Sequence, residues 1–264
     1  MSFLGAFLLG LVEGITEFLP ISSTAHLIIF SKILNISSDN FTKFFEVFIQ
    51  AGAVLSVVIL YTKYILKNKK LLSKILISFI TTSLVAVPFY KVIKNVFFES
   101  SLLIIFNFIL IGIVFLITEN LISRKIVKLN KDLKSLDIKQ AVIIGLAQGF
   151  SIMPGVSRAG AVILAMVFLK YKRKEAVVYS FLLAVPTILA AGIFDLYKVG
   201  LESILISNIN LLNLTIGFLS SFVSAVVVIQ FFIRYLQKND LKIFGYYRLI
   251  FVLLLIIFFQ KLLL

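Results

Sequence analysis

The segment Met153-Pro154-Gly155-Val156-Ser157-Arg158-Ala159-Gly160 lies in the middle of an apolar stretch, residues 140–169, and decides how the chain is folded. Basic clusters flank this stretch on both sides, at 124–139 and 170–174. Because basic loops of membrane proteins stay in the cytoplasm, a single crossing would leave one cluster outside. At about 1.5 Å per residue the stretch is too short for two full crossings. Proline and glycine interrupt a helix here, so we predict a re-entrant hairpin with its tip at membrane depth.

The composition agrees with a membrane protein. Of 264 residues, 61% are hydrophobic and 14% are charged, against about 45–50% and 25% in soluble domains. These values exclude an ordinary soluble domain, a disordered chain and a fibrous repeat. The chain has no cysteine and one histidine, which excludes a disulfide framework and a multi-histidine metal site. The first basic residue is Lys32, so we expect the N-terminal segment to belong to the mature fold.

The net charge of +14 would suggest a nucleic-acid partner in a soluble protein. Here most basic residues fall into four clusters between apolar runs, and we interpret the clusters as cytoplasmic loops. No nucleic-acid partner is therefore expected. The clusters cover residues 63–74, 124–139, 170–174 and 234–248.

The alternation of clusters and apolar runs predicts an all-α polytopic membrane protein with six transmembrane helices and two re-entrant hairpins. The less basic loops at 91–101 and 195–210 are expected outside. The six spans are expected at 44–61, 75–90, 102–119, 176–194, 211–233 and 246–263.

An internal repeat organises these elements into a single integral membrane domain, residues 1–264. The segment Gly10-Leu11-Val12-Glu13-Gly14 resembles Gly145-Leu146-Ala147-Gln148-Gly149, and each is followed by proline and then serine. Residues 1–119 form the first predicted repeat and 140–264 the second. Each has a hairpin and three spans, and since three is odd the copies have opposite orientations. The first hairpin, residues 1–30, is then expected to start and end outside.

Polar residues within the apolar segments mark a candidate site, because an ionisable side chain costs about 2.5–3.5 kcal/mol in a membrane segment. Glu13 and Glu17 are four residues apart and share one helix face. Such a pair suits a shared cation, Mg²⁺ or Ca²⁺, or general acid–base chemistry. The structural alternative is neutralisation by a distant basic residue. Glu46 and Gln50 form a similar pair that either supports the site or joins two helices.

Hydroxyl groups and the histidine follow Pro20. Ser22, Ser23 and Thr24 can cap a helix whose free N–H groups bind an anion. His26 is three residues after Ser23, where it could deprotonate a hydroxyl or protonate a leaving group. The alternative interpretation is that these residues are ordinary capping groups and a structural histidine.

The second hairpin supplies the phosphate-binding candidates. Arg158 can bind phosphate bidentately, next to Ser157, and Gly155 allows an anion to approach the backbone. Gln148 occupies the repeat position of Glu13, and we include it among the substrate-binding candidates. A salt bridge from Arg158 to a glutamate is the structural alternative. The whole set fits phosphoryl transfer on an amphiphile, or else an anion or proton-coupled transporter.

Two stretches of the chain resemble the undecaprenyl pyrophosphate phosphatase family of bacteria, and they run from Glu13 to Leu27 and from Pro154 to Arg158. By resemblance, Glu13 and Glu17 match the paired acidic motif. The family's Ser-Ser-Thr-x-His run is matched by Ser22, Ser23, Thr24 and His26, and its Pro-Gly-x-Ser-Arg loop by Ser157 and Arg158. Ala25, Ala159 and Val162 depart from the usual Gly, Ser and Thr, and the last two remove hydroxyls near the phosphate loop.

The resemblance implies hydrolysis of undecaprenyl diphosphate at the bacterial plasma membrane, lipid-carrier recycling for peptidoglycan synthesis and bacitracin resistance. We expect Glu17, Ser23, His26 and Arg158 to be catalytic. Either Ser23 attacks the terminal phosphorus, which we favour, or water does so with Glu17 as base. The site is expected to open to the outer face, and a transporter or lipid-phosphate flippase is the rival function.

Overall fold

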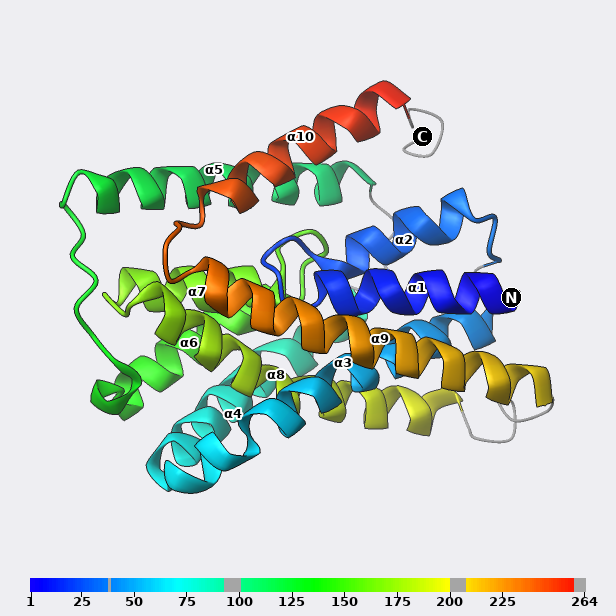
Figure 1. The fold of residues 1–264 in the computed structure, drawn as a ribbon, viewed down its shortest axis with the longest axis horizontal. Helices are drawn as coiled ribbons and strands as arrows, with labels where there is room; N and C mark the ends of the chain where they lie inside the picture. Colours follow the sequence, from blue (N-terminus) through cyan, green and yellow to red (C-terminus); the bar gives the residue numbers. More distant parts are fainter. Residues whose placement is uncertain (38, 93–100, 200–207, 259–264) are drawn as a thin grey trace. The chain divides into compact units, whose positions relative to one another are not determined.

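The computed structural model describes residues 1–37, 39–92, 101–199 and 208–258. Within these ranges the secondary structure is helical, apart from one isolated bridge between Lys131 and Tyr171, so the all-α prediction is confirmed (Figure 1). The helices are α1 (Phe3–Thr16), α2 (Ser23–Ile33), α3 (Asn40–Lys67), α4 (Lys69–Val92), α5 (Ser101–Ser123), the 3₁₀ turn η2 (Leu133–Ser135), α6 (Ile138–Phe150), α7 (Arg158–Phe168), α8 (Arg173–Val199), α9 (Asn208–Tyr235) and α10 (Lys242–Phe258).

Five helices of the described chain are long and apolar enough to cross a membrane, which makes this a multi-pass membrane protein. They lie in α3, α4, α5, α8 and α9 and correspond to five of the six predicted spans. The sixth, 246–263, lies on α10, which has 17 residues in the described part of the chain. Residues 259–263 of that span lie outside the described residues. The same holds for residues 93–100 of the predicted outer loop at 91–101 and residues 200–207 of the one at 195–210.

The four short helices form two pairs at the positions of the predicted hairpins. α1 contacts α2, and α6 contacts α7. The longest of them, α1, has 14 residues, or about 21 Å of helix, which is less than the roughly 30 Å of a bilayer core. The segment holding α6 and α7 also returns to its starting point, because Lys131 N–H donates to Lys170 O at 3.0 Å.

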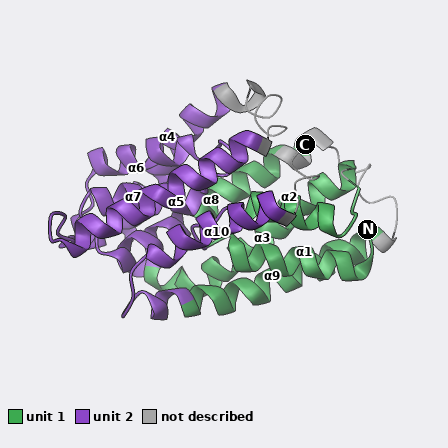
Figure 2. Cartoon of the chain, turned by 90° about the horizontal axis from the view of Figure 1, so that it is seen from above, with its two compact units in different colours: residues 1–18, 23–64, 184–231 green, residues 19–22, 65–183, 232–264 purple. Residues whose placement is uncertain are grey.

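The chain divides into two compact units, drawn in Figure 2. Unit 1 contains residues 1–18, 23–64 and 184–231, and unit 2 contains residues 19–22, 65–183 and 232–264. The tip of the α1–α2 turn therefore belongs to unit 2, whereas the helices on either side of that tip belong to unit 1.

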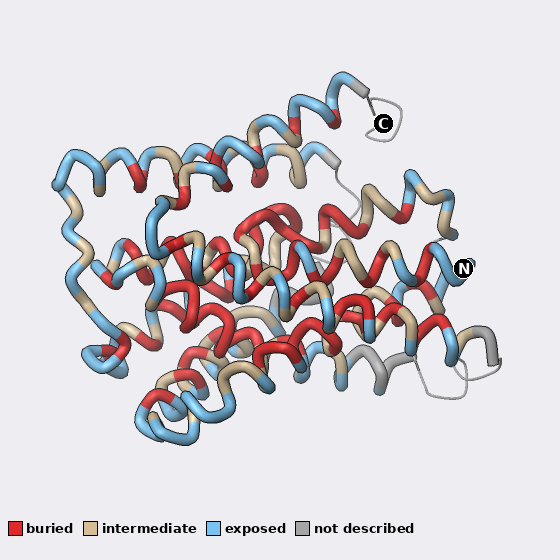
Figure 3. The backbone as a smooth tube through the Cα atoms, in the orientation of Figure 1, coloured by how far each residue is buried: buried red, intermediate tan, exposed pale blue. Residues whose placement is uncertain are grey.

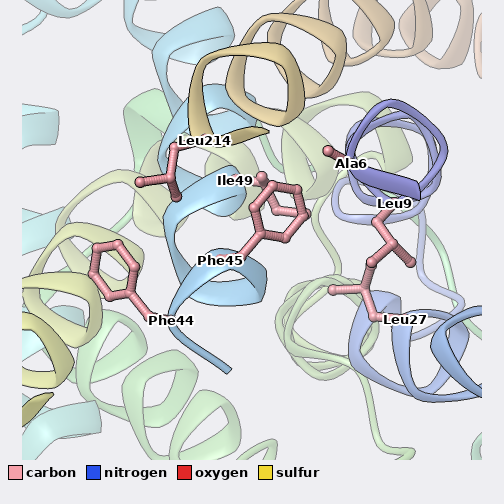
Figure 4. Close-up of a cluster of buried hydrophobic side chains, with 7 residues drawn as sticks. All are labelled: Ala6, Leu9, Leu27, Phe44, Phe45, Ile49 and Leu214. Carbon is pink, nitrogen blue, oxygen red and sulfur yellow. The ribbon is translucent and has the colours of Figure 1, made fainter. Parts of the chain in front are cut away.

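Unit 1 is held together by apolar side chains from four helices. A buried cluster joins α1, α2, α3 and α9 (Figure 4). Small residues let α1 and α9 approach closely, since a Cβ on Gly14 would lie 2.2 Å from Ser221 O. Such small-residue contacts are typical of helices packed inside membranes. The cluster consists of Ala6, Leu9, Leu27, Phe44, Phe45, Ile49 and Leu214.

Unit 2 uses the same kind of packing. A Cβ on Gly145 of α6 would lie 2.5 Å from Ser78 O of α4, and Thr82 Oγ1 donates to Gly145 O at 3.0 Å. α5 runs along α10, where a Cβ on Gly245 would lie 2.9 Å from Gly112 O. Substitution of these glycines would push the helices apart.

Large apolar side chains are exposed along the long helices. Figure 3 shows exposed positions along the chain in pale blue. Leu84 on α4, Phe106 on α5 and Val227 on α9 are examples. In water such faces would be unfavourable, whereas hydrocarbon chains of lipids can cover them. The exposed apolar faces agree with the membrane assignment.

Candidate active site

The α1–α2 turn carries the first group of candidate residues. α1 ends where Glu17 N–H donates to Glu13 O at 2.9 Å, and α2 begins at Ser23. Pro20 lies in the intervening turn, and Ser22 has a positive φ of 71°. This backbone conformation is uncommon for a residue other than glycine, so the turn holds Ser22 in a strained geometry.

Glu17 and Ser23 lie in direct contact. The Ser23 hydroxyl donates a hydrogen bond to Glu17 Oε2, and both side chains are buried within unit 1. A buried carboxylate that accepts a hydrogen bond from a serine hydroxyl can activate that hydroxyl as a nucleophile. The structure thus brings together two of the four residues that we predicted to be catalytic.

The remaining polar residues of this turn lie on the same two helices. Glu13 is fully buried one helical turn before Glu17, and His26 is buried in the first turn of α2. Thr24 is half-buried next to Ser23. Glu46 of α3 accepts a hydrogen bond from Ser31 of α2 at 2.9 Å, so it fastens α2 to α3.

The α6–α7 turn carries the second group. Gly155 has a φ of 90°, and a Cβ there would lie 2.7 Å from Ile104 O of α5. Asn107 of α5 donates to Pro154 O at 2.7 Å. Both the conformation and the close approach therefore require glycine at this position.

Ser157 caps α7 and is buried. Its hydroxyl accepts a hydrogen bond from Gly160 N–H at 3.1 Å, and its φ is 75°. The first backbone N–H groups of α7 have no acceptor within the helix, and groups of this kind at a helix N-terminus stabilise anions. Arg158 begins the helix, and its Nη1 donates to Ser180 O of α8 at 2.9 Å. A guanidinium beside a helix N-terminus is suited to phosphate.

Gln148 lies in the last turn of α6, and its backbone carbonyl accepts a hydrogen bond from Ser151 N–H at 2.9 Å, at the start of the α6–α7 turn. Its Nε2 donates to Thr82 Oγ1 of α4 at 3.0 Å, and the side chain is buried. This bond joins α4 to α6 within unit 2. Gln148 therefore has a packing contact of its own, in addition to the substrate-binding role that we predicted for it.

Arg248 is a residue that sequence reasoning assigned wrongly. We interpreted it as part of a cytoplasmic loop cluster, whereas it lies inside α10 with 0% exposure. Its guanidinium donates to Pro20 O at 2.8 Å, Gly155 O at 2.9 Å and Val156 O at 3.0 Å. An arginine within a predicted span was the available signal, because intramembrane charges mark functional positions.

Metal ligands are sparse in the described part of the chain. It contains no group of three or more His, Cys, Asp or Glu side chains placed to hold a metal ion. Glu13 and Glu17, one helical turn apart, provide two carboxylates. Such a pair suits a Mg²⁺-type ion that takes its other ligands from water and substrate phosphates.

The fold and the site define a class: a multi-pass helical membrane protein with a carboxylate–serine pair and an arginine-bearing helix N-terminus at two breaks between short helices. Residues 6–254 match the family model of the bacitracin resistance protein BacA, and the chain belongs to this family.

Three relatives are similar over nearly their whole length, and each is named undecaprenyl-diphosphatase. The protein of Aquifex aeolicus is 40% identical, over 96% of this chain and 97% of its own. That of Methanococcus aeolicus is 38% identical, over 99% and 100%. That of Sulfurimonas denitrificans is 38% identical, over 98% and 100%.

Proposed function

We propose that this chain is an undecaprenyl-diphosphatase. It hydrolyses undecaprenyl diphosphate to undecaprenyl phosphate and inorganic phosphate, which recycles the lipid carrier for peptidoglycan synthesis and confers bacitracin resistance. The observation that carries the proposal is the buried hydrogen bond from Ser23 to Glu17. Membership of the BacA family and the names of the three relatives support the substrate assignment.

The proposed reaction has two steps. Ser23 Oγ attacks the terminal phosphorus and passes its proton to Glu17, while the bond from phosphorus to the bridging oxygen breaks. Undecaprenyl phosphate leaves with the bridging oxygen, and His26 donates the proton that this oxygen needs. Water then attacks the phosphoserine and passes its proton to His26, which is now neutral, while Glu17 returns its proton to Ser23 Oγ. This step releases inorganic phosphate and restores Ser23, Glu17 and His26 to their starting states. The alternative is direct attack by water with Glu17 as base.

Charge stabilisation is the proposed task of the α6–α7 turn. Arg158 and the first N–H groups of α7 would neutralise the phosphates, with Gly155 and Ser157 shaping the turn. Ser22 and Thr24 would donate further hydrogen bonds from the first turn. Support comes from the helix N-terminus at Arg158 and from the hydroxyl of Ser157, which caps that helix.

A divalent cation, Mg²⁺ or Ca²⁺, is the proposed cofactor. Glu13 and Glu17 would hold it together with phosphate oxygens of the substrate. When bound, the ion would neutralise the diphosphate and favour attack on phosphorus. The complete burial of Glu13 supports a role of this kind, because an ionisable side chain is costly inside a membrane segment and marks a functional position.

We propose the finer membrane topology as well. Six spans and two re-entrant hairpins would form two inverted repeats, 1–119 and 140–264, in the bacterial plasma membrane. The order of two short helices followed by three longer ones occurs twice, from α1 to α5 and from α6 to α10, which supports this arrangement. The catalytic turn would then open to the outer face.

Cysteine labelling tests the orientation, because the chain has no cysteine of its own. With a membrane-impermeant maleimide on intact cells, Thr24→Cys should be labelled. The control Lys134→Cys, in the basic segment assigned to the cytoplasm, should not be labelled until the cells are lysed. Labelling of Thr24→Cys only after lysis would contradict the outer-face opening.

The activity itself is tested with purified protein in detergent and undecaprenyl diphosphate as substrate. Phosphate should be released, and Ser23→Ala and Arg158→Ala should each lower kcat by about 10²-fold or more. Ser73→Ala removes an exposed serine of α4 and should leave the rate unchanged. Uptake of the lipid into vesicles with no phosphate release would instead favour the transporter alternative.

A further inference from the structure

Arg248 is the largest side chain that is fully buried in the described chain, and the proposed reaction does not use it. We propose that it is a positioning residue that fixes the two turns bearing the phosphate-binding groups in one active geometry. This inference rests on the proposed phosphatase function. The three hydrogen bonds of the guanidinium carry it, because they reach backbone carbonyls of both turns.

All the bonded atoms belong to unit 2. Pro20 is in the tip of the α1–α2 turn, and Gly155 and Val156 are in the α6–α7 turn. Pro20 and Arg248 are 228 residues apart in the chain, and Gly155 and Arg248 are 93 apart. One side chain thus fixes the distance between two turns that come from different halves of the sequence.

The bonded carbonyls occupy equivalent places in the two turns. Pro20 is two residues before Ser22, and Gly155 is two residues before Ser157. Both serines have positive φ, 71° and 75°. A residue other than glycine keeps this conformation only where its surroundings impose it. Arg248 therefore binds the carbonyl two residues before each strained serine, and also the carbonyl of Val156 next to Ser157. Ser157 in turn caps the helix that begins at Arg158.

The chemistry of the contact requires arginine. A buried guanidinium is unfavourable unless its donors are satisfied, and here Nε, Nη1 and Nη2 each have a carbonyl partner. The ring of Phe108 covers one face, with its centroid 4.9 Å from Arg248 Cζ. Lysine has the charge but lacks the planar fork that can bond three fixed carbonyls at once.

The packing of α5 and α10 sets the position of this side chain. A Cβ on Gly112 of α5 would lie 3.2 Å from Arg248 Cβ, and Gly245 allows the same close approach one turn earlier on α10. α5 also contacts the α6–α7 turn directly, since its Asn107 side chain donates a hydrogen bond to Pro154 O. The turn is thus bonded from two neighbouring helices.

The first test is steady-state kinetics of Arg248→Met and Arg248→Lys in detergent with undecaprenyl diphosphate. If Arg248 positions the turns, both variants should lose about 10²-fold in kcat, as displacements of about 1 Å typically cause, with KM changed by less than tenfold. Arg124→Met, which removes an exposed arginine, is the matched control and should retain the original rate.

The lysine variant separates geometry from charge. A kcat of Arg248→Lys near that of the unmodified protein would overturn the proposal, because charge alone would then suffice. An unchanged kcat in Arg248→Met would overturn it as well. Thermal unfolding of each variant identifies those that fold, and if the methionine variant does not fold, the lysine variant carries the same test.

Amide hydrogen exchange tests the positioning role without any activity. In folded Arg248→Met, exchange should become faster at residues 19–22 and 154–157, while α4 and α6 exchange as before. Unchanged exchange at both turns would overturn the positioning role. Absence of phosphate release from the unmodified protein would instead refute the proposed function, so the two failures are distinguishable.

Discussion

Ser22 and Ser157 both have a positive φ, 71° and 75°, at the residue that precedes α2 and α7 respectively. The left-handed region costs a residue with a Cβ about 1–2 kcal/mol. Two independent turns hold serine, rather than glycine, in this conformation. Strain of this kind persists where the surrounding structure imposes it, and it gathers at active sites.

The first prediction concerns that strain. Ser22→Gly should be more stable than Ser22→Ala by about 1 kcal/mol, because glycine relieves the left-handed conformation and alanine does not. Thermal unfolding in detergent measures the difference. At Ser73, an exposed residue inside α4, the order should reverse, since alanine is the better helix former there. An Ala variant at position 22 as stable as the Gly variant would show that the turn is unstrained.

The second prediction concerns Gly155. Gly155→Ala should destabilise the protein by about 2–4 kcal/mol, because the new Cβ adds left-handed strain and meets Ile104 O at 2.7 Å. Gly192→Ala is the matched control. It lies within α8, where a Cβ would meet nothing closer than Val47 Cγ1 at 3.9 Å. That substitution should be neutral or slightly stabilising, and equal unfolding temperatures for the two variants would contradict the prediction.

Much of the fold could be predicted because its signals are local. Long apolar runs correspond to the five long membrane-length helices, and the run at 246–263 corresponds to α10 as far as it is described. The breaks at Pro20 and Pro154 separate α1 from α2 and α6 from α7. Each of these features depends on residues that are neighbours in the chain.

The candidate site could be predicted only in part, for the same reason. The hydrogen bond between Ser23 and Glu17 spans six residues and follows from one tight turn. The contacts of Arg248 span 92 to 228 residues, and no local pattern encodes them. The positive-inside rule assigned Arg248 to a loop, although a single charge inside an apolar run is better explained by internal hydrogen bonds.

The third prediction concerns how the stability of the protein depends on pH through Asp39, which precedes α3 and caps its first turn. The backbone N–H of Thr42 donates to Asp39 at 2.7 Å and lowers the pKa of that carboxyl below its ordinary value of 3.8. The ionised carboxylate of Asp39 therefore stabilises the folded state fully above pH 3.8, the ordinary pKa. This stabilisation is lost as the pH falls through the lower pKa of the folded state. Asp39→Ala should cost about 1 kcal/mol at pH 7.

Thermal unfolding as a function of pH checks this contribution. The difference between the unmodified protein and Asp39→Ala should shrink on acidification below pH 3.8. Asp39→Asn keeps a capping oxygen that does not titrate in this range, so its advantage over the alanine variant should be independent of pH. If the stability difference between the unmodified protein and Asp39→Ala stays constant as the pH falls, the charge of Asp39 makes no contribution to the cap.

The fourth prediction concerns the proposed cation. EDTA should abolish phosphate release, and Mg²⁺ or Ca²⁺ should restore it. Glu13→Gln should raise the half-maximal cation concentration about tenfold or more, because one of two carboxylate ligands is lost. Glu46→Gln, on α3, removes a carboxylate bonded to Ser31 and should leave the cation requirement unchanged. Full activity in EDTA would contradict the cation.

The fifth prediction concerns the pair that would perform the chemistry. Ser23→Ala and Glu17→Gln should each lower kcat by about 10²–10⁴-fold, and the double variant should be no slower than the slower single variant, because the two residues act as a unit. Ser73→Ala, which removes a serine elsewhere, should combine additively with either. If the loss of kcat in the double variant equals the product of the two single losses, Ser23 and Glu17 act independently.

Trapping the intermediate distinguishes the two nucleophiles. Rapid acid quenching of the unmodified protein with undecaprenyl diphosphate labelled at the terminal phosphorus should leave radioactivity on the protein, at the peptide that contains Ser23. The label should be absent from Ser23→Ala and present in Ser73→Ala. If Ser23→Ala keeps most of its kcat and no label appears in any variant, water is the nucleophile and Glu17 acts on it directly.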